Sequence, residues 1–255
     1  NSYKAWQTHN QTTINTMQQL EQENNRIFID AYGLQDELTP EVPLKEITLT
    51  CNPYYRYSSD NSPEQLEQRL QTDTCKELVS YAIGNMMGRY SLNETGLIYA
   101  HANNIGFDPT RYTTFPADAD GILPVTDILW FADDAANRVR EFLLAVWGQT
   151  TLAENLLWLA DSLGRKSEET PEEAIRRYIA TSFYKDHLQT YKKRPIYWLF
   201  SSGKHKAFEA LVYLHRYNEG TLARMRTVYV TPLMGKLQQR MNDLDTEIAA
   251  SSSSA

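Results

Sequence analysis

The sequence of 255 residues lacks a long apolar run and contains only two cysteines. No stretch approaches the roughly 18 apolar residues of a membrane-spanning helix, and the N-terminus lacks the charged and apolar regions of a signal peptide. Cys51 and Cys75 form no CxxC arrangement, and two thiols cannot supply a disulfide framework for a chain of this length. We therefore expect a protein of the reducing cytoplasm, with no membrane partner.

Motifs for catalysis and for cofactor binding are also missing. Ser201 and Ser202 have no Gly-x-Ser-x-Gly context, and Gly203-Lys204 lacks the earlier glycine of a phosphate-binding loop. The spacing of the histidines does not fit a zinc site. These are His9, His101, His187, His205 and His215. We expect no catalytic, cofactor-binding or metal-binding residue within this chain.

Two short motifs imitate functional sites. Asn52-Pro53-Tyr54-Tyr55 is similar to the Asn-Pro-Pro-Tyr motif with which amino-methyltransferases hold a flipped adenine, but its second proline is missing. No strand with a Gly-rich turn precedes it, as a nucleotide-type fold would require. Asp118-Ala119-Asp120-Gly121 is similar to part of a calcium loop, but Pro116 occupies the first ligand position. We interpret the first motif as non-functional and the second as an acidic turn.

Charge is distributed unevenly along the chain, whose net charge is −7. Residues 1–173 hold 12 basic and 26 acidic residues, a balance of −14, and residues 174–226 hold 11 basic and 3 acidic residues, a balance of +8. A Lys-rich solvated face and a phosphate-binding surface both explain this segment. The DNA-binding interpretation selects Lys192, Lys193, Arg194, Lys204, Lys206, Arg216, Arg224 and Arg226. The neighbouring Trp198 fits base stacking, but we favour a place in the core.

Hydrophobic periodicity and capping signals predict a predominantly α-helical α+β fold. Residues 2–32 contain no Pro or Gly, which predicts a long, spacer-type N-terminal helix that ends at Gly33. Its expected apolar stripe consists of Trp6, Met17, Leu20, Ile27, Phe28 and Ala31.

A helical body follows in the prediction. Ser62-Pro63-Glu64-Gln65 supplies an N-cap and a capping box for a helix that ends near Gly88. Similar signals predict helices over 135–147, 151–163, 170–191 and 221–248, the last of them a long C-terminal helix interrupted at Pro232. The runs 195–200 and 207–214 predict a small β-hairpin, although the second also fits a helix. A short strand is predicted over 46–50, and an irregular junction over 96–120.

These elements suggest four parts. They are a spacer helix over 1–38, a helix with an irregular junction over 39–131, a helical subdomain with the basic hairpin over 132–248, and a flexible tail over 249–255. Because the chain opens at Asn1 without an initiator Met, we expect it to be excised from a longer polypeptide.

Four stretches resemble three blocks of one enzyme family. Residues 25–34, NRIFIDAYGL, resemble the helix that leaves the target-recognition domain in single-chain restriction-modification methyltransferases. Residues 81–92, YAIGNMMGRYSL, resemble the next block of that group. Residues 194–203, RPIYWLFSSG, and 213–217, YLHRY, are similar to the C-terminal block of the PglX-type adenine-specific DNA methyltransferase of BREX phage-defence systems. The resemblance runs from about residue 1 to residue 241.

The resemblance implies a parent enzyme that methylates adenine N6 in double-stranded DNA with S-adenosylmethionine and so marks self against phage DNA. Its cofactor and Asn-Pro-Pro-Tyr motifs belong to an upstream domain that is absent here. We therefore expect a non-catalytic region that clamps DNA or acts as a scaffold for the recognition domain. The alternative is a protein-interaction module that docks other BREX components or is targeted by phage inhibitor proteins. Restriction endonuclease activity is disfavoured because no Pro-Asp with a following Asp/Glu-x-Lys arrangement stands out.

Overall fold

The structure is a computed structural model that describes residues 2–57 and 61–252. The chain forms two compact units, residues 1–74 and residues 75–255, and the helix α3 (Pro63–Met86) contains the boundary between them. The four parts predicted from the sequence divide the chain more finely, and their boundaries stay predictions. No helix in the described ranges is both long enough and apolar enough to cross a membrane.

The first unit is built on the predicted long helix, α1 (Ser2–Tyr32), which is confirmed. Gly33 ends it with a φ of +67°, and the N–H of Leu34 donates back to the carbonyl of Ile29 at 2.9 Å. This left-handed closure strongly favours glycine, because glycine lacks the Cβ that would collide there.

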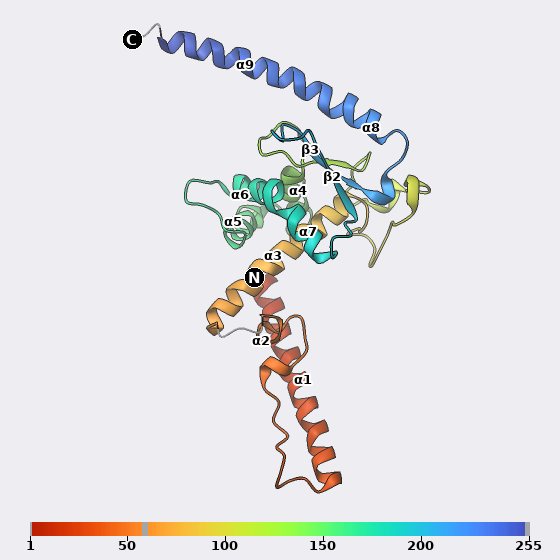
Figure 1. The fold of residues 1–255 in the computed structure, drawn as a ribbon, viewed down its shortest axis with the longest axis vertical. Coiled ribbons are helices and arrows are strands. Elements are labelled where there is room, and N and C mark those ends of the chain that lie inside the picture. Colours follow the sequence, from red (N-terminus) through yellow and green to blue (C-terminus); the bar gives the residue numbers. More distant parts are fainter. Residues whose placement is uncertain (1, 58–60, 253–255) are drawn as a thin grey trace. The chain divides into compact units, whose positions relative to one another are not determined.

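The chain after α1 packs back along the same helix (Figure 1). The side-chain amide of Gln18 donates to the carbonyl of Val42 at 2.7 Å, and Ile14 packs with Val42 and Ile47 in a small core. The apolar stripe predicted for α1 was wrong in part, since Leu20 is exposed and Ile14 is buried instead. Contacts with the returning chain, rather than periodicity alone, select the buried face.

The predicted strand over residues 46–50 was wrong. Leu44–Glu46 forms a 3-10 turn directly after Pro43, and the N–H groups of Glu46, Ile47 and Leu49 all donate to carbonyls within this short stretch. These local bonds leave no ladder for a neighbouring strand to join. The turn leads into the short helix α2 (Pro53–Tyr57).

The helical core of the second unit matches the sequence prediction closely. It contains the end of α3, α4 (Ala135–Trp147), α5 (Leu152–Ser162), α6 (Pro171–Tyr178) and α7 (Tyr184–Thr190), with a π-helical segment over Ile179–Phe183 between the last two. Thr170 and Glu173 form the predicted cap of α6 as a complete capping box. These helices bury a large apolar cluster between them.

A three-stranded antiparallel sheet lies across this helical core. The strands are β1 (Ile122–Pro124), β2 (Tyr197–Ser201) and β3 (Glu209–Tyr213), in the order β1-β3-β2. In the register, Tyr197 pairs with Tyr213 and Ser201 with Glu209, so the predicted hairpin is confirmed and its second run is a strand. β1 was not predicted.

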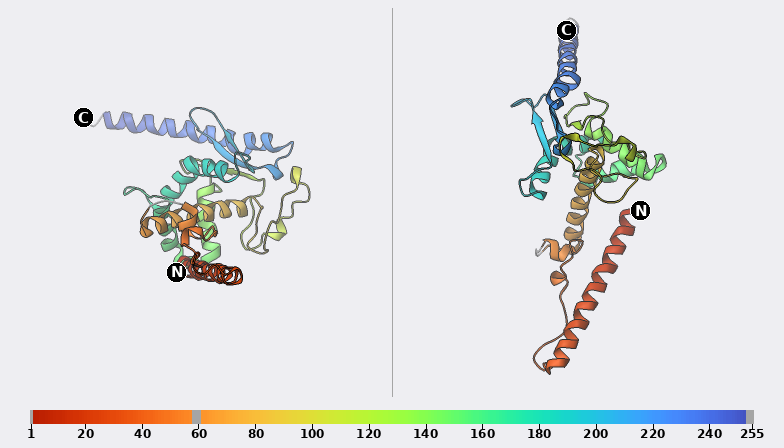
Figure 2. Two further views of the ribbon diagram at one scale, coloured as in Figure 1. Left: turned by 60° about the horizontal axis from the view of Figure 1, so that its bottom comes forward. Right: turned by 90° about the vertical axis from the view of Figure 1, so that its right-hand side faces the viewer.

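The central strand β3 is buried along its whole length and serves two cores. Leu211 and Tyr213 pack into the helical cluster, and Ala210 and Val212 pack into a second cluster with Met225. Alternate residues of a strand face opposite sides of a sheet, which explains the division. Figure 1 shows the strands between the helices α4–α7 and the C-terminal helices, and Figure 2 gives two further views of this arrangement.

The C-terminal helix is interrupted at the predicted place. α8 (Thr221–Arg224) continues as a π-helical segment, Met225–Val230, and then as α9 (Thr231–Ser252). Pro232 lacks the N–H for an α-helical hydrogen bond, and the widened turn before it is where that loss is accommodated. α9 also includes residues 249–252, which the sequence assigned to a flexible tail; residues 253–255 of that tail lie outside the described residues.

Candidate nucleic-acid interface

Three of the predicted basic residues, Lys192, Lys193 and Arg194, lie in the turn that follows α7. Lys192 and Lys193 have φ values of +49° and +63°, a left-handed conformation that costs a residue with a Cβ about 1 kcal/mol or more. Three backbone hydrogen bonds hold it, including one from the N–H of Lys193 to the carbonyl of Leu188 at 2.7 Å. The side chains of Lys192, Lys193 and Arg194 are exposed, and no carboxylate among the described residues pairs with them. We call these three residues the basic turn.

His187 ties the basic turn to the sheet. Its Nε2 accepts the N–H of Ile196 at 3.1 Å, while the ring stacks on Tyr197 with the ring centres 4.9 Å apart. Because Nε2 is the acceptor, the neutral ring carries its proton on Nδ1, which has no partner among the described residues. Burial, and then the charge of Arg89, lower the pKa of His187 to about 4. The imidazole is therefore neutral at pH 7 and positions the turn without adding charge to it.

Lys204 and Lys206 lie in the turn between β2 and β3. The turn is closed by the N–H of Ser202, which donates to the carbonyl of Phe208 at 2.9 Å, and both lysines are exposed. Lys206 forms an ion pair of 3.5 Å with Glu209, so part of its charge is neutralised. β2 has five residues and thus separates this turn from the basic turn by roughly 16 Å.

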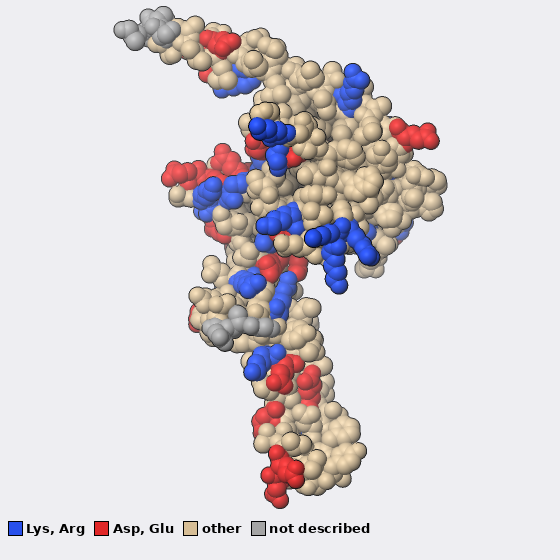
Figure 3. Space-filling view, viewed as in Figure 1, with Lys and Arg blue, Asp and Glu red and all other residues tan. Residues whose placement is uncertain are grey.

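The exposed edge of β2 connects the two turns. In the order β1-β3-β2, β2 pairs with a strand on one side only, within the described part of the chain. Trp198, which we expected in the core, is 45% exposed and lies against Tyr217 with ring centres 6.0 Å apart. We call the basic turn, β2 and the Lys204–Lys206 turn the basic stripe. On the face seen in Figure 3, Lys and Arg side chains gather where α7 ends in Figure 1.

Arg224 and Arg226 belong to other elements, α8 and the π-helical segment after it. Both are exposed, on the element whose buried residues Met225 and Tyr229 pack against the second cluster. They are therefore part of neither the basic turn nor the Lys204–Lys206 turn.

Arg216 is a correction to the predicted set. Its side chain is only 1% exposed, and its guanidinium donates to Asn104 Oδ1 and to the carbonyls of Asp118 and Ala119. The guanidinium also lies 3.8 Å from the ring centre of Phe107. A guanidinium that is buried and held by three acceptors inside the fold cannot reach DNA. Arg216 instead fastens the irregular segment 102–121 to the hairpin.

Both imitation motifs have structural roles. Asn52 is fully buried, and its side-chain amide donates to the carbonyls of Leu44 and Ile47 and accepts the N–H of Tyr54. With both sides of the amide occupied, it cannot hold an adenine. Asp118 Oδ1 accepts the N–H groups of Asp120 and Gly121, which is an acidic turn as interpreted from the sequence. Among the described residues, no three His, Cys, Asp or Glu side chains gather as a metal site would require.

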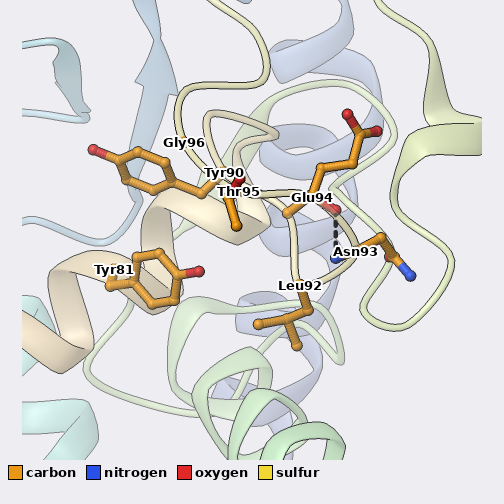
Figure 4. Close-up of a pocket in the computed structure, with 8 residues that line it drawn as sticks. Tyr81, Tyr90, Leu92, Asn93, Glu94, Thr95 and Gly96 are labelled. Carbon is orange, nitrogen blue, oxygen red and sulfur yellow. Dashed lines mark hydrogen bonds between the residues drawn. The ribbon is translucent and has the colours of Figure 1, made fainter.

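A shallow pocket of about 420 Å³ opens beside the end of α3 (Figure 4). The rings of Tyr81 and Tyr90 form one wall, with centres 5.3 Å apart, and Leu92 and Thr95 line it from the following loop. Glu94 at its rim forms a two-point ion pair with Arg111 and is thereby neutralised. The pocket offers mainly aromatic and apolar contact.

Two curated methyltransferases match almost the whole chain. The adenine-specific methyltransferase BrxX of Escherichia coli O9:H4 (strain HS) is 46% identical over 256 residues, which cover 97% of this chain and 21% of that protein. The adenine-specific methyltransferase PglX of Lacticaseibacillus casei (strain Zhang) is 39% identical over 246 residues, which cover 95% and 19%. The chain is similar to a segment of these methyltransferases. The resemblance predicted from the sequence is thereby confirmed, and the chain spans about a fifth of the length of these relatives. No protein-family model matches the sequence.

One candidate binding residue, Arg89, was not identified from the sequence. Arg89 follows α3 within the YAIGNMMGRYSL block, is partly buried, and donates to the hydroxyls of Tyr90 and Tyr213. Tyr213 lies 124 residues away in the chain. The sequence places only Tyr90 beside Arg89, whereas Tyr213 reaches Arg89 through the fold.

Proposed function

We propose that this chain is a non-catalytic, DNA-contacting region near the C-terminus of an adenine-specific DNA methyltransferase that acts in BREX phage defence. The observation that supports it best is the exposed basic turn, whose three cations have no carboxylate partner among the described residues, in a chain 46% identical to a segment of such an enzyme. Adenine-N6 methylation with S-adenosylmethionine then belongs to another part of the polypeptide.

The basic stripe suits contact with the DNA backbone rather than base reading. Phosphate contacts by Lys and Arg set the register and orientation of a protein on the duplex and carry no sequence information directly. The left-handed backbone of Lys192 and Lys193 and the tie to His187 fix the direction in which these cations leave the surface. A fixed cationic turn can clamp DNA while a different domain recognises the bases.

Charge reversal of the basic turn in the complete methyltransferase tests this role. We expect the triple variant K192E/K193E/R194E to bind DNA more weakly and to reduce the slope of log affinity against log salt by about 3, since each phosphate contact contributes about 0.9. Fluorescence anisotropy with a labelled duplex at several salt concentrations measures both quantities. S-adenosylmethionine affinity should stay unchanged.

A matched control separates local contact from net charge. The variant K4E/K45E/K166E changes the net charge equally at three exposed lysines outside the stripe. We expect it to alter the salt slope by much less. Equal slopes for the parent protein and the basic-turn variant would contradict the clamp.

A second candidate function, docking of other defence components, rests on α1. Leu20, Ile27 and Phe28 are more than half exposed on this helix, and exposed apolar side chains in such number mark interaction surfaces. Replacing all three with Asp should abolish capture of other BREX proteins by the tagged methyltransferase without changing its DNA affinity. Capture that survives the triple substitution would reject α1 as the docking surface.

A further inference from the structure

Arg89 carries a positive charge that the described part of the protein does not neutralise. Its Nε donates to the hydroxyl of Tyr90 at 3.1 Å and its Nη1 donates to the hydroxyl of Tyr213 at 3.3 Å. No carboxylate within residues 2–57 and 61–252 forms an ion pair with it. A guanidinium has five N–H donors, and a partly buried one is normally paired.

Of the two tyrosine hydroxyls that accept from Arg89, one still has a proton available to donate. Tyr213 uses its own proton on the carbonyl of Tyr99 at 2.7 Å. The proton of Tyr90 has no acceptor among the described residues, because the hydroxyl of Tyr90 only accepts from Arg89. The site therefore contains an unneutralised cation and at least one unused O–H donor, and an anion would satisfy both.

Tyr197 adds a second hydroxyl without a described partner. Its ring is buried and stacks on His187. Its hydroxyl forms no hydrogen bond within the described chain and is not one of the buried polar atoms left without a partner, so it is open to solvent and can donate to a ligand.

The rings of Tyr90 and Tyr197 meet at Gly84. A Cβ at this position would lie 2.5 Å from Cδ2 of Tyr90 and 3.4 Å from the hydroxyl of Tyr197. Both rings therefore approach the same point of α3, and the close approach of Tyr90 requires the absence of a side chain there. The same residues lie close to the basic turn, since the ring of His187 is 4.9 Å from Tyr197 and 4.7 Å from Tyr191, the residue before Lys192.

We infer that Arg89, Tyr90 and Tyr197 form a binding site for a phosphate group, with the guanidinium supplying charge and the hydroxyls supplying directed donors. For a phosphate of the DNA backbone this inference rests on the proposed function; a free nucleotide carries the same chemistry.

A purely structural role of Arg89 predicts a different effect of removing the Tyr197 hydroxyl. If the guanidinium only tied Tyr90 to Tyr213, the hydroxyl of Tyr197 would be dispensable for binding any ligand. Tyr197→Phe removes that hydroxyl and leaves the ring and every described hydrogen bond of Arg89 in place. Tyr217→Phe is the matched control, since its ring packs against Trp198 and Phe200 and no described hydrogen bond is lost.

The test titrates the 255-residue chain with inorganic phosphate, followed by phosphorus NMR, and then with deoxyadenosine monophosphate. We expect Tyr197→Phe to weaken phosphate binding about fivefold, the effect of one hydrogen bond, and Tyr217→Phe to leave it unchanged. Arg89→Gln should abolish binding. Since Arg89 also holds two tyrosines, near-UV circular dichroism checks the fold of that variant, and Tyr197→Phe decides the outcome if Arg89→Gln unfolds.

Anisotropy with a duplex separates the two sources of phosphate. Weaker duplex binding by Tyr197→Phe assigns the site to the DNA backbone, whereas weaker mononucleotide binding with unchanged duplex binding assigns it to a free nucleotide. No phosphate binding, or equal binding by the parent chain and Tyr197→Phe, overturns the site. In that case, a loss of duplex affinity in K192E/K193E/R194E would leave the proposed function intact.

Discussion

His187 accepts the backbone N–H of Ile196 at 3.1 Å and thereby joins the end of α7 to the start of the hairpin. This bond spans the basic turn, and it exists only while the imidazole is neutral, because a protonated ring has no acceptor nitrogen. The placement of three surface cations thus depends on one buried, uncharged ring.

The first prediction concerns this ring. His187→Phe should lower the free energy of unfolding by about 1–3 kcal/mol, because the backbone N–H groups of Ile196 and Tyr197, at 3.1 and 3.4 Å from Nε2, lose their acceptor. Urea unfolding monitored by circular dichroism measures the change. Substituting the exposed His205 with Phe is the control and should have little effect.

His187 also predicts a pH dependence. Its pKa in the folded protein is lowered to about 4, below its ordinary value near 6.5, so the unfolded chain takes up the proton first as pH falls. Stability from the neutral ring is complete above about pH 6.5 and is lost as pH falls towards 4. The difference in unfolding free energy between the parent chain and His187→Phe should therefore shrink across this interval. A constant difference would show that the ring is not titrating there.

Asp118 predicts the opposite slope. Burial, and then the charge of Asp120, raise the pKa of Asp118 to about 6, above the ordinary value near 4. The folded state holds this proton more tightly, so the contribution is complete below about pH 4 and is lost as pH rises through 6.

Asp118→Asn keeps the oxygen that accepts from Asp120 and Gly121 but removes the charge. We expect it to raise stability at pH 7 by about 1–2 kcal/mol, allowing for solvent screening of a partly exposed group. Thermal unfolding at pH 4 and pH 7 measures this, and the gain should vanish at pH 4. A gain of equal size at both pH values would exclude charge as its cause.

Arg216 and Arg224 should respond differently to the same substitution. Arg216→Met leaves three buried acceptors without donors, and we expect a loss of about 2–4 kcal/mol in unfolding free energy. Arg224→Met, on the surface, should change stability by less than about 0.5 kcal/mol. Chemical denaturation of both variants decides the point, and equal losses would be inconsistent with the buried role of Arg216.

Asn52 should matter for folding and not for methyl transfer. Asn52→Ala removes two hydrogen bonds to the carbonyls of Leu44 and Ile47, and we expect it to destabilise the first unit by about 1–3 kcal/mol. In the complete methyltransferase, the rate per folded molecule should stay at the parent value at low temperature. Methylation that disappears while the protein stays folded would give Asn52 a catalytic part.

Sequence patterns predicted the helices well because their signals are local. The Thr170–Glu173 capping box and Gly33 act within one turn, so the residues that specify these ends lie beside them. The strand β1 had no such signal. It contains only three residues, one of them Pro124, and exists because Ile122 pairs with Val212, ninety positions away in the chain.

The candidate site was predictable in part for the same reason. The basic turn is contiguous in sequence, and its exposure follows from the Lys-Lys-Arg composition. Charge alone could not separate Arg216, whose acceptors are carbonyls of a distant irregular segment, from Arg194 on the surface. Nor could it reveal the tyrosines around Arg89, which meet only after the hairpin has packed on α3.

The position of β3 has a consequence for local opening. Leu211 and Val212 are neighbours in sequence, but they anchor different apolar clusters, and the backbone between them is hydrogen-bonded to strands on both sides. Its amide protons can reach water only when both clusters loosen together. This strand should hold its amide protons longest in deuterated solvent, and fraying of α9 alone should leave them protected.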